Sequence, residues 1–168
     1  MIGLVNMFVF EDYYGNQVRL SFADHPFAKA PDHVWIVCRF QEKWLLTDHR
    51  ERGLEFPGGK IEARESPTQA AVREVLEETG GVVDELTYIG QYKVGEALVK
   101  NIYFANIKAL KPRQNYLETN GPVLLTELPT NVREDSRFSF IMKDEVLVYT
   151  LAEIKRRSLC SNAFSGFS

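Results

Sequence analysis

The segment from Ser66 to Gly81 constrains the fold most, because it carries the start and stop signals of one α-helix. Ser66 is a good N-cap, Pro67 suits the first helical position, and Gln69 lies three residues after Ser66, which completes a capping box. Gly80 and Gly81 supply the stop signal. The sequence therefore predicts a helix from 67 to 79, in the middle of the chain.

The sequence on both sides of this helix is mostly β-like. A turn at Tyr14-Gly15-Asn16 predicts a hairpin, and "HVWIVCRF" predicts a buried strand with "KWLLT" as its hairpin partner. Residues 51–67, which are rich in Gly and Pro, are expected to be mostly loop. Later strands are predicted at "LTYIGQYKV", "LVKNIYFANI" and "PVLLTEL", followed by a C-terminal helix over 139–158. The expected class is α+β, with a mixed curved sheet and two helices.

Composition excludes several classes of protein. The chain has 168 residues, 45% of them hydrophobic, and a net charge of −3, which fits one globular domain and disfavours a general binder of long polyanions. No apolar run approaches the roughly 18 residues that span a bilayer, so we expect no membrane contact and a cytoplasmic location. Cys38 and Cys160 lack metal or disulfide spacing, and Cys38 is expected to be a buried thiol. The three histidines, which lack HxxxH spacing, are expected to be solvated or structural: His25, His33 and His49.

The ends of the chain suggest where the domain lies. The opening "MIGLVNMFVF" lacks a basic region and a small-residue cleavage site, so we do not expect it to act as a signal peptide. Met7 is an alternative start to Met1, which would make residues 1–6 an N-terminal extension. We expect a single domain over 7–158 and a frayed tail over 159–168.

The predicted helix separates apolar from acidic side chains. On a helical wheel, one arc of about 100° holds the apolar and hydroxyl side chains Val72, Val75, Leu76 and Thr79, and the opposite arc holds the carboxylates Glu74, Glu77 and Glu78. A solvated face is the ordinary interpretation, but surface faces usually mix charges of both signs. A hard divalent cation would relieve the repulsion, since Mg²⁺ prefers oxygen ligands. Gly58 and Gly59, shortly before the helix, allow close backbone approach and suggest the wall of a metal and phosphate site.

These residues resemble the Nudix box. That motif is Gly, five residues, Glu, seven residues, Arg-Glu, an aliphatic residue, any residue, Glu-Glu, any residue, Gly and an aliphatic residue. The positions in register are Gly59, Glu65, Arg73, Glu74, Val75, Glu77, Glu78 and Gly80. The one departure is Gly81, which stands where the motif has an aliphatic residue.

The resemblance extends beyond the box, over about Met7 to Leu151, to the YtkD type of Nudix hydrolase from Bacillus and relatives. The segments that carry it include "DYYGN", "HVWIVCRF", "FPGGKIE", "VKNIYFA" and "ETNGPV". It implies the Nudix fold, a mixed curved β-sheet sandwiched between helices in an α/β/α arrangement.

The resemblance also implies roles for the box residues. Glu74, Glu77 and Glu78 would be metal ligands and catalytic residues, and Glu65 would be either a supporting ligand or a partner of Arg73. Arg73 would orient a box glutamate or form a simple i,i+4 pair with Glu77.

Other assignments remain open. Gly58, Gly59 and Lys60 are candidate phosphate contacts, although Lys60 is equally a solvated lysine. The resemblance also implies an acid from a later loop that acts as a metal ligand or general base. Glu118 is the candidate, although it is otherwise a loop acid with no role, and Glu96 and Glu127 are weaker choices. Candidates for base recognition, which are otherwise core residues, are Asn101, Tyr103, Phe138 and Phe140.

The resemblance implies Mg²⁺-dependent hydrolysis of nucleoside triphosphates to monophosphate and pyrophosphate, with Mn²⁺ as a substitute. Oxidised purine nucleotides such as 8-oxo-dGTP are one candidate substrate. Two alternatives stay open: a pyrophosphohydrolase acting on 5′-triphosphate RNA ends, and a non-catalytic module that senses a nucleotide. No extended nucleic-acid surface is evident, and the sequence leaves the oligomeric state open.

Overall fold

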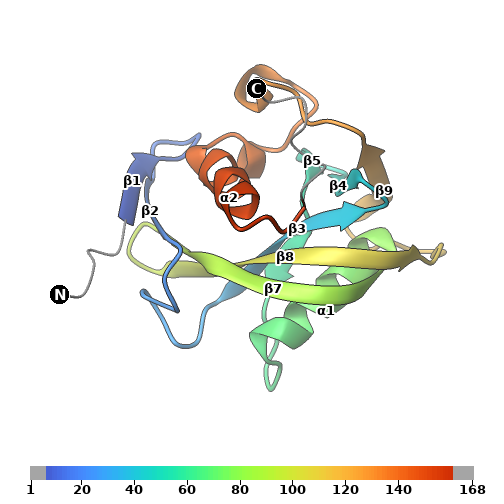
Figure 1. Cartoon of the computed structure of the whole chain (residues 1–168), viewed down its shortest axis with the longest axis horizontal. Helices are drawn as coiled ribbons and strands as arrows, with labels where there is room; N and C mark the ends of the chain where they lie inside the picture. Colours follow the sequence, from blue (N-terminus) through green and yellow to red (C-terminus); the bar gives the residue numbers. More distant parts are fainter. Residues whose placement is uncertain (1–6, 161–168) are drawn as a thin grey trace.

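The computed structural model describes residues 7–160 and contains one mixed sheet and two α-helices (Figure 1). The expected extension, residues 1–6, and most of the expected tail lie outside the described residues. The strands are β1 (Met7–Glu11), β2 (Gln17–Ser21), β3 (His33–Phe40), β4 (Lys43–His49), β5 (Gly53–Glu55), β6 (Gly58–Lys60), β7 (Gly81–Val94), β8 (Leu98–Leu110) and β9 (Thr119–Leu125). The helices are α1 (Pro67–Thr79), α2 (Glu145–Arg156) and the short 3₁₀ turns η1 (Val132–Glu134) and η2 (Phe140–Met142).

Helix α1 has the predicted boundaries because both signals act locally. The Ser66 hydroxyl accepts a hydrogen bond from the Gln69 backbone amide at 3.1 Å, and the Gln69 side chain accepts one from the Ser66 amide at 2.9 Å. Gly80 ends the helix in the left-handed region at φ 74°, a conformation that costs glycine no Cβ clash. The capping box and the glycine stop are therefore confirmed.

The sheet runs in the order β1-β2-β7-β8-β3-β4-β5, with β6 paired to β3 and β9 paired to β4. Strands β3 and β8 are parallel, whereas the other pairs are antiparallel. Both predicted hairpins form, β1 with β2 and β3 with β4. Past the turn that closes the second hairpin, β4 diverges from β3, and β6 takes its place at the start of β3.

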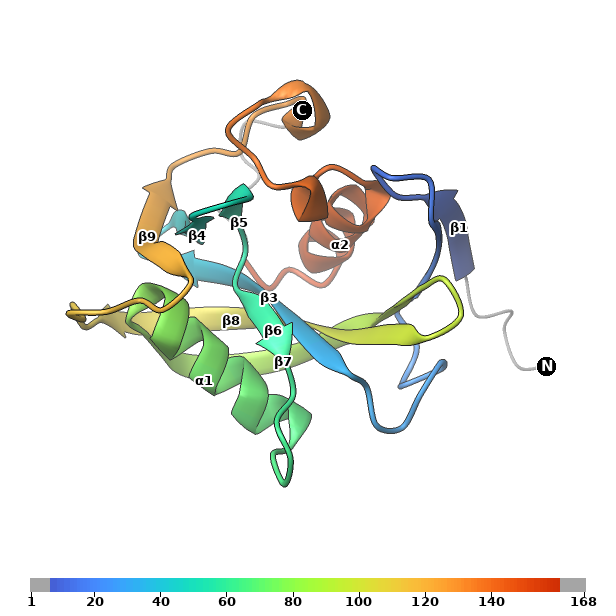
Figure 2. The same ribbon diagram turned by 180° about the vertical axis from the view of Figure 1, so that it is seen from behind.

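The two helices cover opposite faces of the sheet (Figures 1 and 2). Side chains of α1 pack with Val34, Ile36 and Tyr103, and those of α2 pack with Trp35 and Phe104. Strand residues alternate between these two cores, as the period of a β-strand requires. The expected α+β class, with a mixed sheet between helices, is confirmed.

The packed face of α1 differs from the wheel prediction. Its buried residues are Ala70, Ala71, Val75 and Thr79. Val72, expected in the core, has 43% of its surface exposed. Ala70 and Ala71, which share or border the acidic side on the helical wheel, are fully buried, and their small side chains let the helix approach the sheet closely. The acidic side of α1 therefore turns partly inward.

Three other expectations need correction. The loop predicted over 51–67 contains two short strands, β5 and β6, whose pairing partners are distant in sequence. The C-terminal helix starts at Glu145, not Ser139, because the Asp144 side chain caps it by accepting from the Val146 amide at 2.8 Å. Leu159 and Cys160, the first residues of the expected tail, pack against the core.

Cys38 is fully buried, as predicted. Within residues 7–160, neither α-helix has the length and apolar character needed to cross a membrane.

Candidate active site

A cavity of about 780 Å³ opens where β4 and β6 separate, beside α1. It brings together most of the residues singled out in the sequence: Gly58, Gly59, Lys60, Arg73, Glu74, Glu77, Glu78 and Glu118. Glu65 does not line the cavity. It accepts a hydrogen bond from Arg73, which does. Glu96 and Glu127, the weaker candidates for a base, are not among the lining residues. The box residues therefore meet in space as their spacing predicted.

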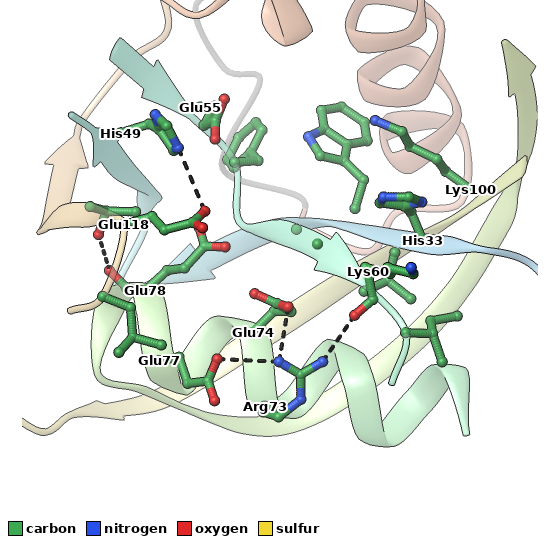
Figure 3. A pocket seen from close by; sticks show the side chains of 18 of the residues that line it. His33, His49, Glu55, Lys60, Arg73, Glu74, Glu77, Glu78, Lys100 and Glu118 are labelled. Atoms are coloured by element: carbon green, nitrogen blue, oxygen red, sulfur yellow. Dashed lines mark hydrogen bonds and ion pairs between the residues drawn. The ribbon is translucent and has the colours of Figure 1, made fainter. Parts of the chain in front are cut away.

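Arg73 connects the acidic residues of the site (Figure 3). Its guanidinium donates two hydrogen bonds to Glu65, at 2.6 and 2.8 Å, in a bidentate arrangement. The same group donates to Glu74 at 2.9 Å, to Glu77 at 3.2 Å and to the Lys60 carbonyl at 3.1 Å. These hydrogen bonds lower the pKa of Glu65 to about 2. Arg73 thus fixes the orientation of three carboxylates and joins the helix to the end of β6.

Glu74 and Glu78 form a partly buried carboxyl pair on the inner side of α1. Burial raises the pKa of both groups, and the hydrogen bond between the two carboxyls raises that of Glu78 further. Arg73 acts in the opposite direction on Glu74. One oxygen of Glu78, Oε2, is buried without a hydrogen-bond partner. The pair therefore includes one carboxyl oxygen, Oε2 of Glu78, that no described residue satisfies.

Gly58 and Gly59 are required by this packing. A Cβ on Gly58 would lie 2.5 Å from the Val34 carbonyl oxygen, and one on Gly59 would collide with the Glu74 carboxylate. Both glycines thus let strand β6 approach its neighbours more closely than any other residue permits.

Gly81, the departure from the motif, also has a structural reason. A Cβ there would lie 2.8 Å from Thr79 Oγ1 and 3.0 Å from Val75 Cγ1. The Thr79 hydroxyl accepts a hydrogen bond from the Gly81 amide at 2.9 Å. The threonine therefore occupies the space that a side chain at position 81 would need.

Glu118 lies at the mouth of the cavity, with 86% of its side chain exposed. Its Oε2 is 3.8 Å from Nε2 of His49. The other His49 nitrogen, Nδ1, accepts from the backbone amides of Glu51 and Arg52, both at 3.2 Å. This assigns the ring proton to Nε2, which faces Glu118. His49, expected to be solvated or structural, is 7% exposed and lines the site.

Sequence reasoning missed several cavity residues. They are His33, Trp35, His49, Arg52, Glu55 and Lys100. Each lies on or beside a strand whose pairing brings it to the site, and no local motif marks it. Of the candidates for base contacts, Asn101, Tyr103 and Phe138 are buried in the core and are not among the lining residues.

The donor set suits a hard divalent cation. Glu74, Glu77 and Glu78 present only carboxylate oxygens, and the unpartnered oxygen of Glu78 lies among them. Among residues 7–160, no three acidic, histidine or cysteine side chains form a preassembled metal cluster. The contacts with Arg73 account for this, since they draw Glu74 and Glu77 toward the guanidinium.

Comparison with known proteins agrees with this site. The NUDIX domain model matches residues 29–115. YtkD from Bacillus subtilis (strain 168) is 55% identical over 152 residues, which cover 89% of this chain and 96% of the relative. The chain belongs to the Nudix family.

Solved structures support the Nudix assignment. The pyrophosphohydrolase BsRppH from Bacillus subtilis superimposes with a TM-score of 0.88 and 54% identity, covering 90% of this chain and 98% of that one. A NUDIX hydrolase from Nitrosomonas europaea shares the fold with a TM-score of 0.60 at 19% identity, over 76% of this chain and 90% of that one. The expected Nudix fold is confirmed. The expected enzyme class, a hydrolase of phosphoric anhydride bonds, is also confirmed. Members of this family generally depend on divalent metals.

Proposed function

We propose that this Nudix enzyme hydrolyses the 5′-triphosphate of a nucleotide, releasing pyrophosphate and leaving a 5′-monophosphate. The observation that carries this proposal is the partly buried Glu74–Glu78 pair, which has one unpartnered oxygen and lines a cavity large enough for a nucleotide. The named relatives support the reaction class: YtkD carries a provisional assignment as an 8-oxo-dGTP diphosphatase, and BsRppH is called a pyrophosphohydrolase.

Glu74, Glu77 and Glu78 are the proposed ligands of Mg²⁺, with Mn²⁺ as a substitute. When bound, the cations supply electrostatic stabilisation for the charge that develops on the diphosphate. In the metal-free protein, Arg73 bonds two of the three carboxylates, Glu74 and Glu77, and these would turn from the guanidinium toward the cations on binding. Glu65 supports this arrangement through Arg73 and not as a direct ligand, since it does not line the cavity.

Glu118 is the proposed general base. It is solvent-exposed at the mouth of the cavity, so it can take a proton from the attacking water and pass it to solvent. His49 faces it at 3.8 Å and would orient the carboxylate. Lys60, which lies on β6 and lines the cavity, would neutralise a phosphate oxygen.

The test is a panel of free nucleoside triphosphates, including 8-oxo-dGTP, and 5′-triphosphate RNA, each assayed for pyrophosphate release with Mg²⁺, Mn²⁺ or EDTA. We expect release that depends on the divalent cation. No release from any substrate would instead support a non-catalytic module, which the complete set of box acids disfavours.

A further inference from the structure

Two threonines from the sheet hold the last turn of helix α1. The carbonyl groups in the final turn of a helix have no partner within the helix itself. The Glu78 carbonyl accepts a hydrogen bond from the Thr47 hydroxyl on β4, at 3.0 Å, and one from the Thr119 hydroxyl at the start of β9, at 3.2 Å. Both threonines are buried. Side chains far away in sequence therefore fix the backbone of a proposed metal ligand.

Thr119 directly follows Glu118, and both belong to one closed turn. The Thr119 amide donates to the Tyr116 carbonyl at 3.3 Å, and between them Leu117 adopts the left-handed conformation, with φ at 59°. The Glu118 carbonyl accepts from the Arg50 amide, also at 3.3 Å. The backbone on both sides of Glu118 is thus held in place, although 86% of its side chain is exposed.

The Thr119 hydroxyl joins this turn to the helix. It accepts a hydrogen bond from the Gly121 amide at 3.1 Å, and as a donor it has two carbonyl oxygens in reach, that of Glu78 at 3.2 Å and that of Tyr116 at 3.4 Å. Burying a hydroxyl costs free energy unless it is hydrogen-bonded, so this group stabilises the fold only through these contacts. It lies where the turn that carries Glu118 meets the helix that carries Glu78.

The separation of these two carboxylates matters to the proposed reaction. Glu118 and Glu78 both line the cavity (Figure 3). A general base must lie within hydrogen-bond reach of the water that it deprotonates. A displacement of about 1 Å between reacting groups can cost about a hundredfold in rate.

We propose that Thr119 is a positioning residue, which holds the general base Glu118 at a fixed distance from the metal ligand Glu78. Thr47 bonds the same carbonyl from β4, and it also lies 3.3 Å from the Gly121 carbonyl, but it is not part of the turn that carries Glu118. Thr47 therefore supports the end of the helix without placing the base. This inference rests on the proposed function and adds a residue to its mechanism.

The test is a double-mutant cycle on Mg²⁺-dependent pyrophosphate release, with the substrate of the panel above that the wild-type enzyme hydrolyses fastest. We expect Thr119→Val, which removes the hydroxyl, to lower kcat about tenfold and to leave KM within about twofold. Glu118→Gln alone should lower kcat at least about a hundredfold. In that background, Thr119→Val should lower kcat less than about twofold further, because no base remains to be placed. Thr119→Ser, which keeps the hydroxyl, should restore at least about half of the wild-type kcat.

Thr47→Val is the matched control, because it removes a hydroxyl from the same carbonyl. Its melting temperature should fall about as much as that of Thr119→Val, since each variant loses one buried hydrogen bond, but its kcat should fall less than about threefold. If Thr119→Val does not fold, Thr119→Cys gives the same comparison, since a thiol is a weak donor.

Three results would overturn the positioning role. They are equal losses of kcat in the two valine variants, an equal effect of Thr119→Val with and without the Glu118 carboxylate, and wild-type turnover in Glu118→Gln. Each of them leaves the proposed function standing as long as the wild-type enzyme releases pyrophosphate. Absence of release by the wild-type enzyme from every substrate would overturn both proposals.

Discussion

At the scale of single residues, Glu78 decides the chemistry of the site. Its carboxyl is buried against Glu74, and one oxygen has no partner. We expect Glu78→Gln to lower turnover at least about a hundredfold, because the amide keeps the shape but removes a ligand charge and one acceptor oxygen. The fold should persist, since a neutral amide is easier to bury than a carboxylate. Steady-state kinetics with Mg²⁺ and a thermal melt measure both effects.

Glu127→Gln is the control for that substitution, because Glu127 is exposed and lies outside the cavity. It should retain wild-type turnover. Near-wild-type hydrolysis by Glu78→Gln would exclude Glu78 as a metal ligand.

The contact between Arg73 and Glu65 predicts how the unfolding free energy depends on pH. Its hydrogen bonds hold the pKa of Glu65 at about 2, below the ordinary value of 4.5. Because the pKa is lower in the folded state, this contribution to stability is present above pH 4.5 and is lost as the pH falls toward 2. Arg73→Met should therefore lower the unfolding free energy by about 2 kcal/mol at pH 7 and make its fall between pH 4.5 and 2 less steep.

Chemical denaturation at several pH values, without divalent cations, measures this slope. Arg113→Met, which removes an exposed arginine away from the site, should leave the slope unchanged. If the unfolding free energy of Arg73→Met falls with pH as steeply as that of the wild type, then a group other than Arg73 lowers the pKa of Glu65.

At the scale of elements, strand β6 places a glycine against the acidic helix. In Gly59→Ala the new Cβ would meet the Glu74 carboxylate, the flexible end of a side chain and not backbone. We expect turnover to fall at least about tenfold, since Glu74 must move away from its position, while the melting temperature changes little.

The control at this scale is Gly95→Ala. Its Cβ would meet no atom within 4 Å, but its φ of 61° strains an alanine. This variant should lose about 1 kcal/mol of stability and keep full activity. Full activity in Gly59→Ala, together with loss of activity in a stable Gly95→Ala, would contradict the proposal that β6 holds Glu74 in position.

Sequence predicts elements well where the signals are local. The bounds of α1 follow from Ser66 and Gly80, whose caps involve residues within one turn. The buried face of α1 does not follow from its own pattern. The alanines are buried because the sheet approaches them, and the acids turn inward because Gly58 and Gly59 leave room. These effects depend on β3 and β6, which contact the helix only in the folded chain.

At the scale of the whole molecule, the residues that line the cavity could likewise be predicted only where the signal is local. The motif spacing identified the acidic side, since its residues lie on one helix. His49, His33 and Lys100 were missed as cavity residues. Strand register alone brings His33 and Lys100 beside Lys60, which the sequence had singled out. Strand register depends on pairing between distant segments, and no short window of sequence contains it.

Divalent cations should stabilise the folded protein, because the proposed ligands come together only in the folded chain. Cations that bind the folded site and not the unfolded chain stabilise by about 2.7 kcal/mol at a concentration 100 times the dissociation constant. For a domain of this size, that raises the melting temperature by roughly 5–10 °C. The double variant Glu77→Gln/Glu78→Gln should lose this rise, because it removes two of the three proposed carboxylate ligands. Melts in KCl at matched ionic strength separate binding from simple screening. A rise of the same size in the double variant would place the bound cation elsewhere on the molecule.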